Sequence, residues 1–322
     1  MSTVLVTGAG GFVGGWVSRC LLDQGMNVIG ALRASEPRTH PALGVRERDA
    51  VTWVRLDLRD SESVRAVAEL SFDAVVHLAA VASGLDARED PGAAWEVNAG
   101  GTARLLHKLA LRVQSGDADP KVVVASTGEV YGIGGTQPSR EDDVVSPCSP
   151  YAASKLGAEL SARETRMRTA IRTLVVRPFQ QLGPGQGGRY FVPSVVRRLL
   201  RARREGGRLV QVGSLAPVRD FVDVRDVASA IAALLDRGTD GEVYNISTGC
   251  GVSLRDLFYQ AAVAVGIDAI PETSSELTRS ADLPVLVGDS GKCRAATGWE
   301  PAHSLQRTLQ DIVNYERALD AQ

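Results

Sequence analysis

A tyrosine and a lysine in the middle of the chain have the spacing of a proton-transfer pair. Tyr151 and Lys155 stand four residues apart, and that spacing places two side chains on one face of a helix. An ammonium beside a phenol favours the phenolate, so we expect Lys155 to lower the pKa of Tyr151 from its usual value of about 10 toward neutrality. Exposed Tyr-Lys pairs on helix surfaces have the same spacing, and other motifs must decide between the two interpretations.

A glycine-rich turn follows the first apolar segment of the chain. Residues 3–7 read as a short buried strand, and Gly8, Gly11 and Gly14 come directly after it. In a strand-to-helix turn, the first glycine permits the tight bend, the second lets the backbone approach a pyrophosphate, and the third lets the helix pack on the strand. The first amides of that helix would hold phosphate, which predicts a dinucleotide site rather than a purely structural turn. The residues assigned to this site are Gly8, Gly11, Phe12 and Val13.

The composition is that of a globular, enzyme-sized chain and excludes several classes of protein. The 322 residues, 44% of them hydrophobic, are enough for one large α/β domain with a smaller attachment. A formal net charge of -2 gives no electrostatic case for nucleic acid or an anionic membrane as partner. No apolar run approaches the roughly 20 residues that span a bilayer, and the first residues do not resemble a signal peptide, so we expect a cytoplasmic location. The four cysteines are widely separated and form no metal-like pair, so we expect thiols and no metal site.

Short apolar runs alternate with helix-like segments along the chain. Strands that are apolar throughout and alternate with helices indicate a parallel sheet covered on both faces. With the glycine turn, they predict an α/β fold with a Rossmann-type doubly wound parallel sheet, followed after Pro178 by a smaller, interleaved C-terminal substrate-binding α/β part. The predicted boundaries are 1–177 with about 219–250 for the dinucleotide-binding domain, and 178–218 with 251–322 for the second part. The predicted strands are residues 3–7, 28–29, 51–54, 74–78, 122–124, 174–176, 209–212 and 243–246.

The order of these motifs resembles that of the extended short-chain dehydrogenase/reductase family, the NAD-dependent epimerase/dehydratase family, whose members modify nucleotide sugars. The resemblance covers nearly the whole chain, from the glycine turn through Tyr151 and Lys155 to an Arg-Pro turn at Arg177. It implies that Thr127 supplies the hydroxyl of a catalytic triad with Tyr151 and Lys155. The residues to which it gives a further cofactor-binding role are Asp57, Leu58, Leu78, Ala79, Ala80, Asn98, Tyr151, Lys155 and Arg177.

Segments of the second half are similar to one branch of this family, which acts on GDP-sugars. The branch contains GDP-mannose 4,6-dehydratase and GDP-4-keto-6-deoxy-mannose reductase, and the C-terminal run at residues 297–309 is closer to the reductase. One departure is that Gln180 and Gln181 follow Phe179, where the branch usually has Asn. The similar segments are residues 177–179, 183–186, 219–227, 241–245 and 282–289.

The end of the second predicted strand carries the residues that select the dinucleotide. A ribose with free hydroxyls is usually held by an acid about 20 residues after the glycine turn, whereas a 2′-phosphate prefers arginine. Arg33 and Ser35 stand at that place, so we expect NADP(H) with both residues on the phosphate. Glu36 lies close enough to leave NAD(H) open, and a solvated loop position is the alternative for Arg33.

The resemblance implies a reductase that transfers hydride from NADPH to the C4 ketone of a GDP-4-keto-6-deoxy-hexose. Tyr151 would supply the proton, and Lys155 would support the cofactor's ribose and the acidity of the phenol. Thr127 would hydrogen-bond the oxygen at C4, and forked guanidinium groups would match the diphosphate. The substrate-binding residues are then Thr127, Gln180, Arg219 and Arg279.

Three alternative functions remain open. Glu129 lies two residues after Thr127, as in the dehydratases whose carboxylate removes the proton at C5, so a GDP-mannose 4,6-dehydratase is the first. A nucleotide-sugar 4-epimerase, which oxidises and re-reduces C4 with the same triad, is the second. A non-catalytic NADP-sensing module is the third, although only four lysines occur in the chain and one has the motif's spacing. Helices near residues 94–112 and 151–168 resemble the pair that this family packs across a two-fold axis, so we expect a homodimer.

Overall fold

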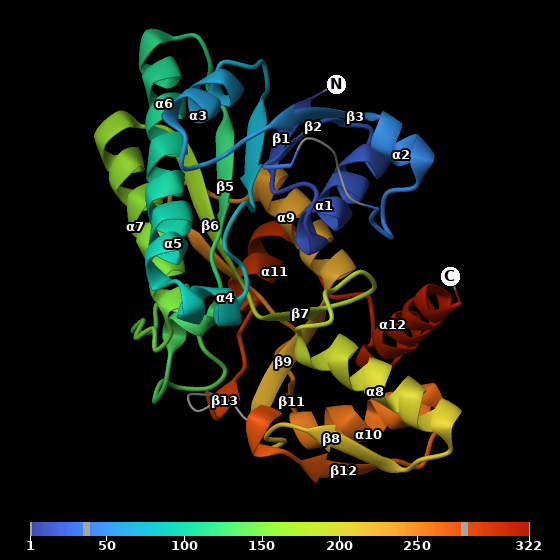
Figure 1. The fold of residues 1–322 in the computed structure, drawn as a ribbon. Helices are drawn as coiled ribbons and strands as arrows, with labels where there is room; N and C mark the ends of the chain where they lie inside the picture. The colour runs from blue at the N-terminus through green and yellow to red at the C-terminus, as the bar shows by residue number, and fades with distance from the viewer. Residues whose placement is uncertain (1, 35–38, 278–282, 322) are drawn as a thin grey trace.

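In the part of the chain that the structure describes, residues 2–34, 39–277 and 283–321 of a computed structural model, a seven-stranded parallel sheet forms the centre of the main part (Figure 1). Its strands are β1 (Thr3–Thr7), β2 (Asn27–Leu32), β3 (Val51–Arg55), β4 (Ala74–His77), β5 (Lys121–Ala125), β6 (Arg172–Pro178) and β10 (Val243–Ile246). The order is β10-β6-β5-β4-β1-β2-β3, and every neighbouring pair is parallel. The predicted doubly wound sheet is confirmed.

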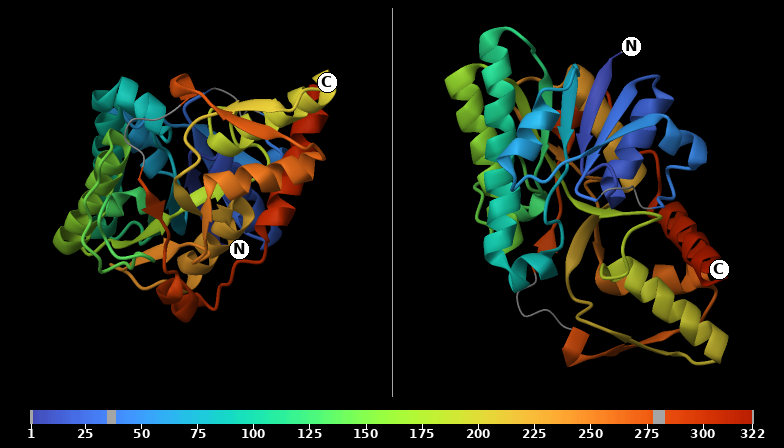
Figure 2. Two further views of the ribbon diagram at one scale, coloured as in Figure 1. Left: turned by 90° about the horizontal axis from the view of Figure 1, so that it is seen from below. Right: turned by 45° about the horizontal axis from the view of Figure 1, so that its top comes forward.

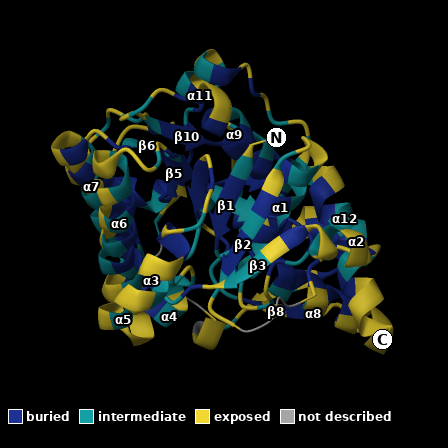
Figure 3. Ribbon diagram, turned by 90° about the horizontal axis from the view of Figure 1, so that it is seen from above, coloured by how far each residue is buried: buried dark blue, intermediate teal, exposed yellow. Residues whose placement is uncertain are grey.

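Helices cover both faces of this sheet. They are α1 (Phe12–Asp23), α3 (Ser61–Ala68), α6 (Thr102–Ser115), α7 (Pro150–Thr169), α9 (Val224–Arg237) and α11 (Gly291–Thr297), with the short α2 (Val45–Asp49) before β3. Val4 and Val6 of β1 pack in one core with α1, α9 and α11, whereas Leu5 packs in the opposite core with α3, α6 and α7. Because strand side chains alternate between faces, a strand covered on both sides must be apolar throughout. Figure 3 shows the result, with buried strands between helices whose outer sides are exposed.

The second part lies below the main sheet in Figure 1. Its elements are β7 (Gln180–Leu182), α8 (Phe191–Glu205), β8 (Leu209–Val212), β9 (Val218–Asp223), β11 (Gly251–Ser253), α10 (Leu254–Val265), β12 (Ile270–Thr273), η3 (Ser275–Leu277), β13 (Val285–Leu286) and α12 (Leu305–Asp320). β9 pairs with β7, β11 and β13, β8 pairs with β12, and α8, α10 and α12 share one core. The chain leaves this part after β9, forms α9 and β10 of the main part, and returns at β11. The two parts therefore interleave, and the domain boundaries at 178, 219 and 251 stay predictions.

The helix predicted near residues 94–112 is interrupted by a π-helical turn. α4 (Gly84–Glu89) and α5 (Pro91–Trp95) lead into the π-helical segment η1 (Glu96–Gly101), and α6 follows without a break. Such segments are rare and often occur at functional sites. Asn98, one of the predicted cofactor residues, lies in η1 and is buried.

The flank formed by α6 and α7 carries exposed apolar side chains. The two helices lie side by side (Figure 2), and Leu111, Leu160 and Met167 are exposed on them. They belong to the pair for which the family resemblance implies a two-fold contact, and the homodimer stays a prediction. Among the helices of the described residues, none combines the length and the apolar character needed to cross a membrane.

The contact between α1 and the turn that follows β1 depends on Gly14. A Cβ atom on Gly14 would lie 2.1 Å from the carbonyl oxygen of Gly8 and 2.7 Å from Cα of Ala9. The methyl group of Gly14→Ala must push α1 away from the backbone of Gly8 and Ala9. We therefore expect the free energy of unfolding to fall by about 1–3 kcal/mol. Urea denaturation followed by circular dichroism measures the change. Gly84→Ala in α4 is the control, because a Cβ there meets no atom within 4 Å, and equal midpoints for the two variants would contradict the close approach.

Candidate active site

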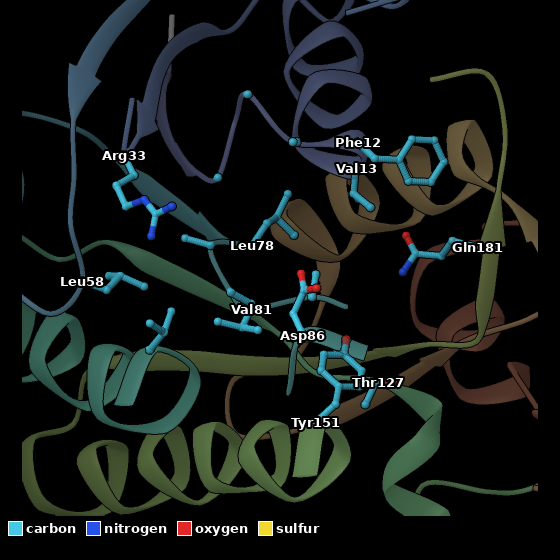
Figure 4. A pocket seen from close by; sticks show the side chains of 18 of the residues that line it. Phe12, Val13, Arg33, Leu58, Leu78, Val81, Asp86, Thr127, Tyr151 and Gln181 are labelled. Atoms are coloured by element: carbon cyan, nitrogen blue, oxygen red, sulfur yellow. The ribbon is translucent and has the colours of Figure 1, made fainter. Parts of the chain in front are cut away.

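A cavity of about 940 Å³ opens at the carboxyl ends of the parallel strands, between the main sheet and β7. The chain runs from β1 to β2 and β3 on one side, and from β4 to β5 and β6 on the other, and open α/β sheets bind ligands where the strand order reverses in this way. Figure 4 shows Arg33 and Leu58 in one region of the cavity and Thr127 with Tyr151 in another. The predicted residues that line it are Gly8, Gly11, Phe12, Val13, Arg33, Asp57, Leu58, Leu78, Ala79, Ala80, Thr127, Glu129, Tyr151 and Gln180.

Gly8, Gly11 and Gly14 form what we call the glycine cradle at the start of α1. Gly8 has a φ of 73°, in the left-handed region, and a Cβ on it would lie 2.9 Å from the backbone nitrogen of Ala79. Gly11 precedes α1 without a side-chain cap, and the first turn contains no acidic residue. The first amides of a helix are donors that suit an anion. The cradle therefore fits the diphosphate of a dinucleotide.

The cavity has a positively charged end. Arg33 follows β2, Arg59 lies beyond the end of β3, and both line the cavity. Arg59 donates two side-chain hydrogen bonds to Asp57, at 3.0 and 2.7 Å, and these hold the pKa of that carboxyl at about 2. Two guanidinium groups thus surround one carboxylate. Ser35, which we predicted on the same phosphate, lies outside the described residues.

Three predicted catalytic groups meet beyond the end of β5. Thr127 caps the 3-10 helix η2 (Gly128–Tyr131), and its hydroxyl accepts a hydrogen bond from the backbone nitrogen of Glu129 at 3.2 Å. Tyr151 stands in the first turn of α7, and its side chain lies beside that of Thr127 (Figure 4). Glu129 lines the cavity beside them. A phenol, a hydroxyl and a carboxylate therefore surround one region of the cavity.

The phenol of Tyr151 keeps its proton at neutral pH. Burial raises its pKa above the ordinary value of 10, the charge of Glu129 raises the pKa further, and the hydrogen bond with Thr127 opposes this rise only in part. The expectation that Lys155 brings this pKa toward neutrality is wrong, because the lost hydration of the phenolate dominates. Tyr151 is therefore prepared to donate a proton rather than to accept one.

Lys155 lies one helical turn beyond Tyr151, outside the cavity lining. Burial lowers its pKa to about 8, and the carboxylate of Glu159 acts in the opposite direction. Within the described part of the chain, its ammonium has no hydrogen-bond partner. A ribose hydroxyl is a suitable hydrogen-bond acceptor for this ammonium, which is a second feature that fits a dinucleotide.

Asn98 is also buried outside the cavity lining. Its side-chain oxygen accepts a hydrogen bond from the backbone nitrogen of Val81 at 2.7 Å, and its amide nitrogen donates to the hydroxyl of Ser154 at 2.9 Å. Asn98 therefore ties the cavity wall after β4 to α7. The direct contact with the cofactor that we assigned to it stays a prediction.

Two predicted arginines are buried behind the cavity rather than in its lining. Arg177 forms an ion pair with Glu159 at 2.7 Å, and Arg219 donates a hydrogen bond to the carbonyl of Val218 at 2.8 Å. Their assigned contacts with cofactor and substrate stay predictions. Arg279, assigned to the diphosphate, lies outside the described residues.

The cavity also contains residues that we did not predict. Gln181 of β7 points into it in Figure 4, and Gln186 donates a hydrogen bond to the carbonyl of Gln181 at 2.9 Å. Tyr190 reaches the opposite wall through a hydrogen bond from its phenol to the carbonyl of Ala82 at 3.4 Å. Arg59 could have been found from its place after a strand end, close to Asp57. Nothing local marks Tyr190, because only the tertiary fold brings its loop to the cavity.

Comparisons with known proteins identify close relatives over most of the chain. GDP-6-deoxy-D-mannose reductase of Pseudomonas aeruginosa is 32% identical over 264 residues, which cover 81% of this chain and 85% of the relative. The solved structure of RMD from Pseudomonas aeruginosa complexed with NADPH is 29% identical, with a TM-score of 0.81 and coverage of 98% and 100% of the two chains. UDP-glucose 4-epimerase from Thermus thermophilus, solved with NAD, is 31% identical, with a TM-score of 0.83 and coverage of 98% and 99%.

A family model agrees with these similarities. The model of the NAD dependent epimerase/dehydratase family matches residues 4–247, a range that contains the glycine cradle, Thr127, Tyr151 and Lys155. The resemblance inferred from the motifs is therefore confirmed. The chain belongs to the NAD dependent epimerase/dehydratase family and is an NAD(P)-dependent enzyme.

Proposed function

We propose that the protein is an NADPH-dependent reductase of the C4 ketone of a GDP-4-keto-6-deoxy-hexose. The observation that carries the proposal is the placement of Tyr151 beside Thr127 in a cavity that the glycine cradle also lines, with burial favouring the neutral phenol by raising its pKa. Reduction of a ketone needs a hydride at carbon and a proton at oxygen, and a neutral phenol supplies the proton. The similarity to a GDP-6-deoxy-D-mannose reductase supports this reaction among those of the family.

In the proposed reaction, side chains of this protein orient the ketone and protonate its oxygen. NADPH, when bound, supplies the hydride for C4. Tyr151 gives its proton to the oxygen as it becomes an alkoxide, a general-acid step of the kind worth roughly 10²–10⁴-fold. Thr127 donates a hydrogen bond to the same oxygen and stabilises its developing charge. Lys155 holds the ribose beside the phenol, and its ammonium stabilises the phenolate that Tyr151 leaves behind.

The positive end of the cavity supports NADP(H) as the cofactor. Guanidinium groups match phosphate oxygens with two parallel hydrogen bonds, and Arg33 and Arg59 both line this end of the cavity, where Arg59 is paired with Asp57. A ribose 2′-phosphate suits that charge better than free hydroxyls do. A similar structure was solved with NADPH and another with NAD, so NAD(H) is the alternative.

A GDP-mannose 4,6-dehydratase is the second candidate, because Glu129 lines the cavity beside Tyr151. A carboxylate at that place could remove a proton from the sugar. A 4-epimerase is the third candidate, supported by the similarity to a UDP-glucose 4-epimerase. Both reactions begin with oxidation at C4, in which Tyr151 must accept a proton, and the raised pKa of a neutral phenol does not assist that step.

Product analysis separates these reactions. The protein is incubated with either GDP-mannose, its 4-keto-6-deoxy derivative, the corresponding UDP-linked ketone or UDP-glucose, once with NADPH and once with NAD⁺ or NADP⁺, because the dehydratase and the epimerase begin with oxidation at C4. We expect NADPH to be consumed only with the GDP-linked ketone, and the product to carry a new hydroxyl at C4. Loss of water from GDP-mannose without net use of cofactor would support the dehydratase, and UDP-galactose from UDP-glucose would support the epimerase. Preference for the UDP-linked ketone over the GDP-linked one would overturn the proposal that guanine is the nucleotide base of the substrate.

Tyr151→Phe removes the proton donor and keeps the ring. We expect turnover of the ketone to fall by about 10²–10⁴-fold, because the alkoxide loses its general acid. Binding of NADPH, followed by fluorescence, should persist. Tyr259→Phe is the control, because it removes the same hydroxyl from an exposed tyrosine of α10. Unchanged turnover in Tyr151→Phe would contradict the role given to the phenol.

Arg33→Met removes one positive charge from the end of the cavity where we place the 2′-phosphate. We expect the dissociation constant for NADPH to rise by about tenfold or more, since a hydrogen bond to a charged group is worth roughly 1.5–3 kcal/mol. The dissociation constant for NADH should change little, because NADH lacks that phosphate. Fluorescence titration with both dinucleotides measures the two dissociation constants. An equal loss of affinity for NADPH and NADH would show that Arg33 does not bind the 2′-phosphate.

A further inference from the structure

Glu159 is a buried carboxylate to which the proposed reaction gives no part. It lies on α7 one turn beyond Lys155, and only 6% of its surface is exposed. Its two oxygens accept hydrogen bonds from Nε and Nη2 of Arg177, at 3.0 and 2.7 Å, and one of them also accepts from the hydroxyl of Ser126. These donors come from β6 and from the residue after β5.

Each partner of Glu159 adjoins the active site. Ser126 is followed directly by Thr127, which lines the cavity. Arg177 is followed by Pro178, with which β6 enters the cavity wall. α7 itself carries the phenol and the ammonium of the predicted triad. One carboxylate thus joins the three segments of the chain that surround the reacting group.

Stability alone does not explain this carboxylate. Taking a buried ion pair out of water costs about as much as the attraction between its charges returns, and apolar residues of similar size often serve as well. Arg177 also has other partners, since it donates to the phenol of Tyr131 at 3.0 Å and lies over that ring at 4.9 Å. The particular contribution of Glu159 must therefore lie in position and charge.

The charge of Glu159 acts on Lys155. Burial lowers the pKa of Lys155 to about 8, and Glu159 is the group that opposes this fall. Other titratable groups nearby in the described residues do not replace it. His77 of β4 is neutral, because burial and then Lys155 lower its pKa to about 3, the phenol of Tyr151 is also neutral, and Arg177 is a cation.

We propose that Glu159 is a positioning residue, which keeps Lys155 an ammonium and fixes the end of β5 against α7. Its carboxylate favours the charged form of the lysine, and its bonds with Ser126 and Arg177 hold the neighbouring segments in place. The part that Lys155 plays in turnover rests on the proposed function. The effect of Glu159 on Lys155 does not, and it can be measured without a substrate.

Titration of Lys155 by nuclear magnetic resonance tests this effect directly. The chain contains only four lysines, so labelling with ¹³C at the lysine ε carbon gives a simple spectrum, in which Lys155→Met assigns the signal. In Glu159→Gln we expect the pKa of Lys155 to fall by about one unit, because a buried ammonium loses its counter-charge. Glu164→Gln is the matched control, since that carboxylate is exposed on the same helix and pairs with Arg168. An unchanged pKa in Glu159→Gln overturns the proposal.

Two further variants keep the test decisive if Glu159→Gln does not fold, because that substitution leaves Arg177 without its counter-ion. Glu159→Gln combined with Arg177→Met removes both charges, and we expect the pKa of Lys155 still to fall, since Glu159 acts on it directly. Glu159→Asp keeps the charge, and we expect Lys155 to titrate close to its wild-type value. A wild-type titration in the double variant overturns the proposal.

The pH dependence of turnover separates a positioning role from a structural one. Lys155 is active as the ammonium, so activity is lost as the pH rises through its pKa of about 8. In Glu159→Gln the alkaline limb of kcat should move to lower pH by the shift that the lysine titration gives, whereas a purely structural defect lowers kcat at every pH. If the alkaline limb of kcat in Glu159→Gln stays at the wild-type pH, the positioning role of Glu159 is overturned. If the wild-type protein reduces no ketone, the proposed function fails, and the lysine titration still decides what Glu159 does.

Discussion

A chain of buried hydrogen bonds links the end of β1 to the helix that carries the phenol. It begins at Thr7, whose hydroxyl accepts from the backbone nitrogens of Leu78 and Ala79 at 3.2 and 3.1 Å. With these lone pairs engaged, the hydroxyl donates to Nδ1 of His77 at 2.8 Å, so the ring carries its own proton on Nε2 and donates it to Thr102 at 3.0 Å. Burial, and then the charge of Lys155, lower the pKa of His77 to about 3, so the ring stays neutral and the direction of donation holds at physiological pH.

The π-helical segment η1 continues this chain to the catalytic helix. Thr102 donates to the backbone oxygen of Asn98 at 2.5 Å, the amide of Asn98 donates to Ser154 at 2.9 Å, and Ser154 donates to the carbonyl of Tyr151 at 2.8 Å. Each group in the series has its donors and acceptors filled by its neighbours, and removing one would leave a buried polar atom unpaired. These buried residues thereby fix where the phenol lies relative to the glycine cradle.

Local patterns predict the elements of this protein better than they predict what its buried polar residues do. The first strand, the glycine cradle and α1 follow from adjacent residues, because the strand is apolar throughout and the glycine spacing encodes a close approach. The motif that contains Asn98 or Arg177 shows only that such a side chain is needed at that place. It does not show whether the partner is a ligand or another buried group, because that partner comes from a distant segment: Val81 and Ser154 for Asn98, and Glu159 for Arg177. The pKa of Tyr151 was out of reach for the same reason, since burial depends on the loops that the fold brings around the phenol.

Two carboxylates of like charge act on two different protonated groups, and both favour retention of the proton. Glu129 opposes ionisation of the phenol of Tyr151, and Glu159 opposes loss of the proton from Lys155. Burial acts differently on the two groups, because it favours the neutral phenol and disfavours the ammonium, so only the lysine needs a counter-charge to stay protonated. The phenol of Tyr151 and the ammonium of Lys155 are therefore both protonated close to the place where a carbonyl oxygen would become an alkoxide. Reduction of a ketone uses the proton of the phenol directly, whereas oxidation of a sugar hydroxyl first requires Tyr151 to ionise while Lys155 stays an ammonium, and this difference supports the proposed reductase.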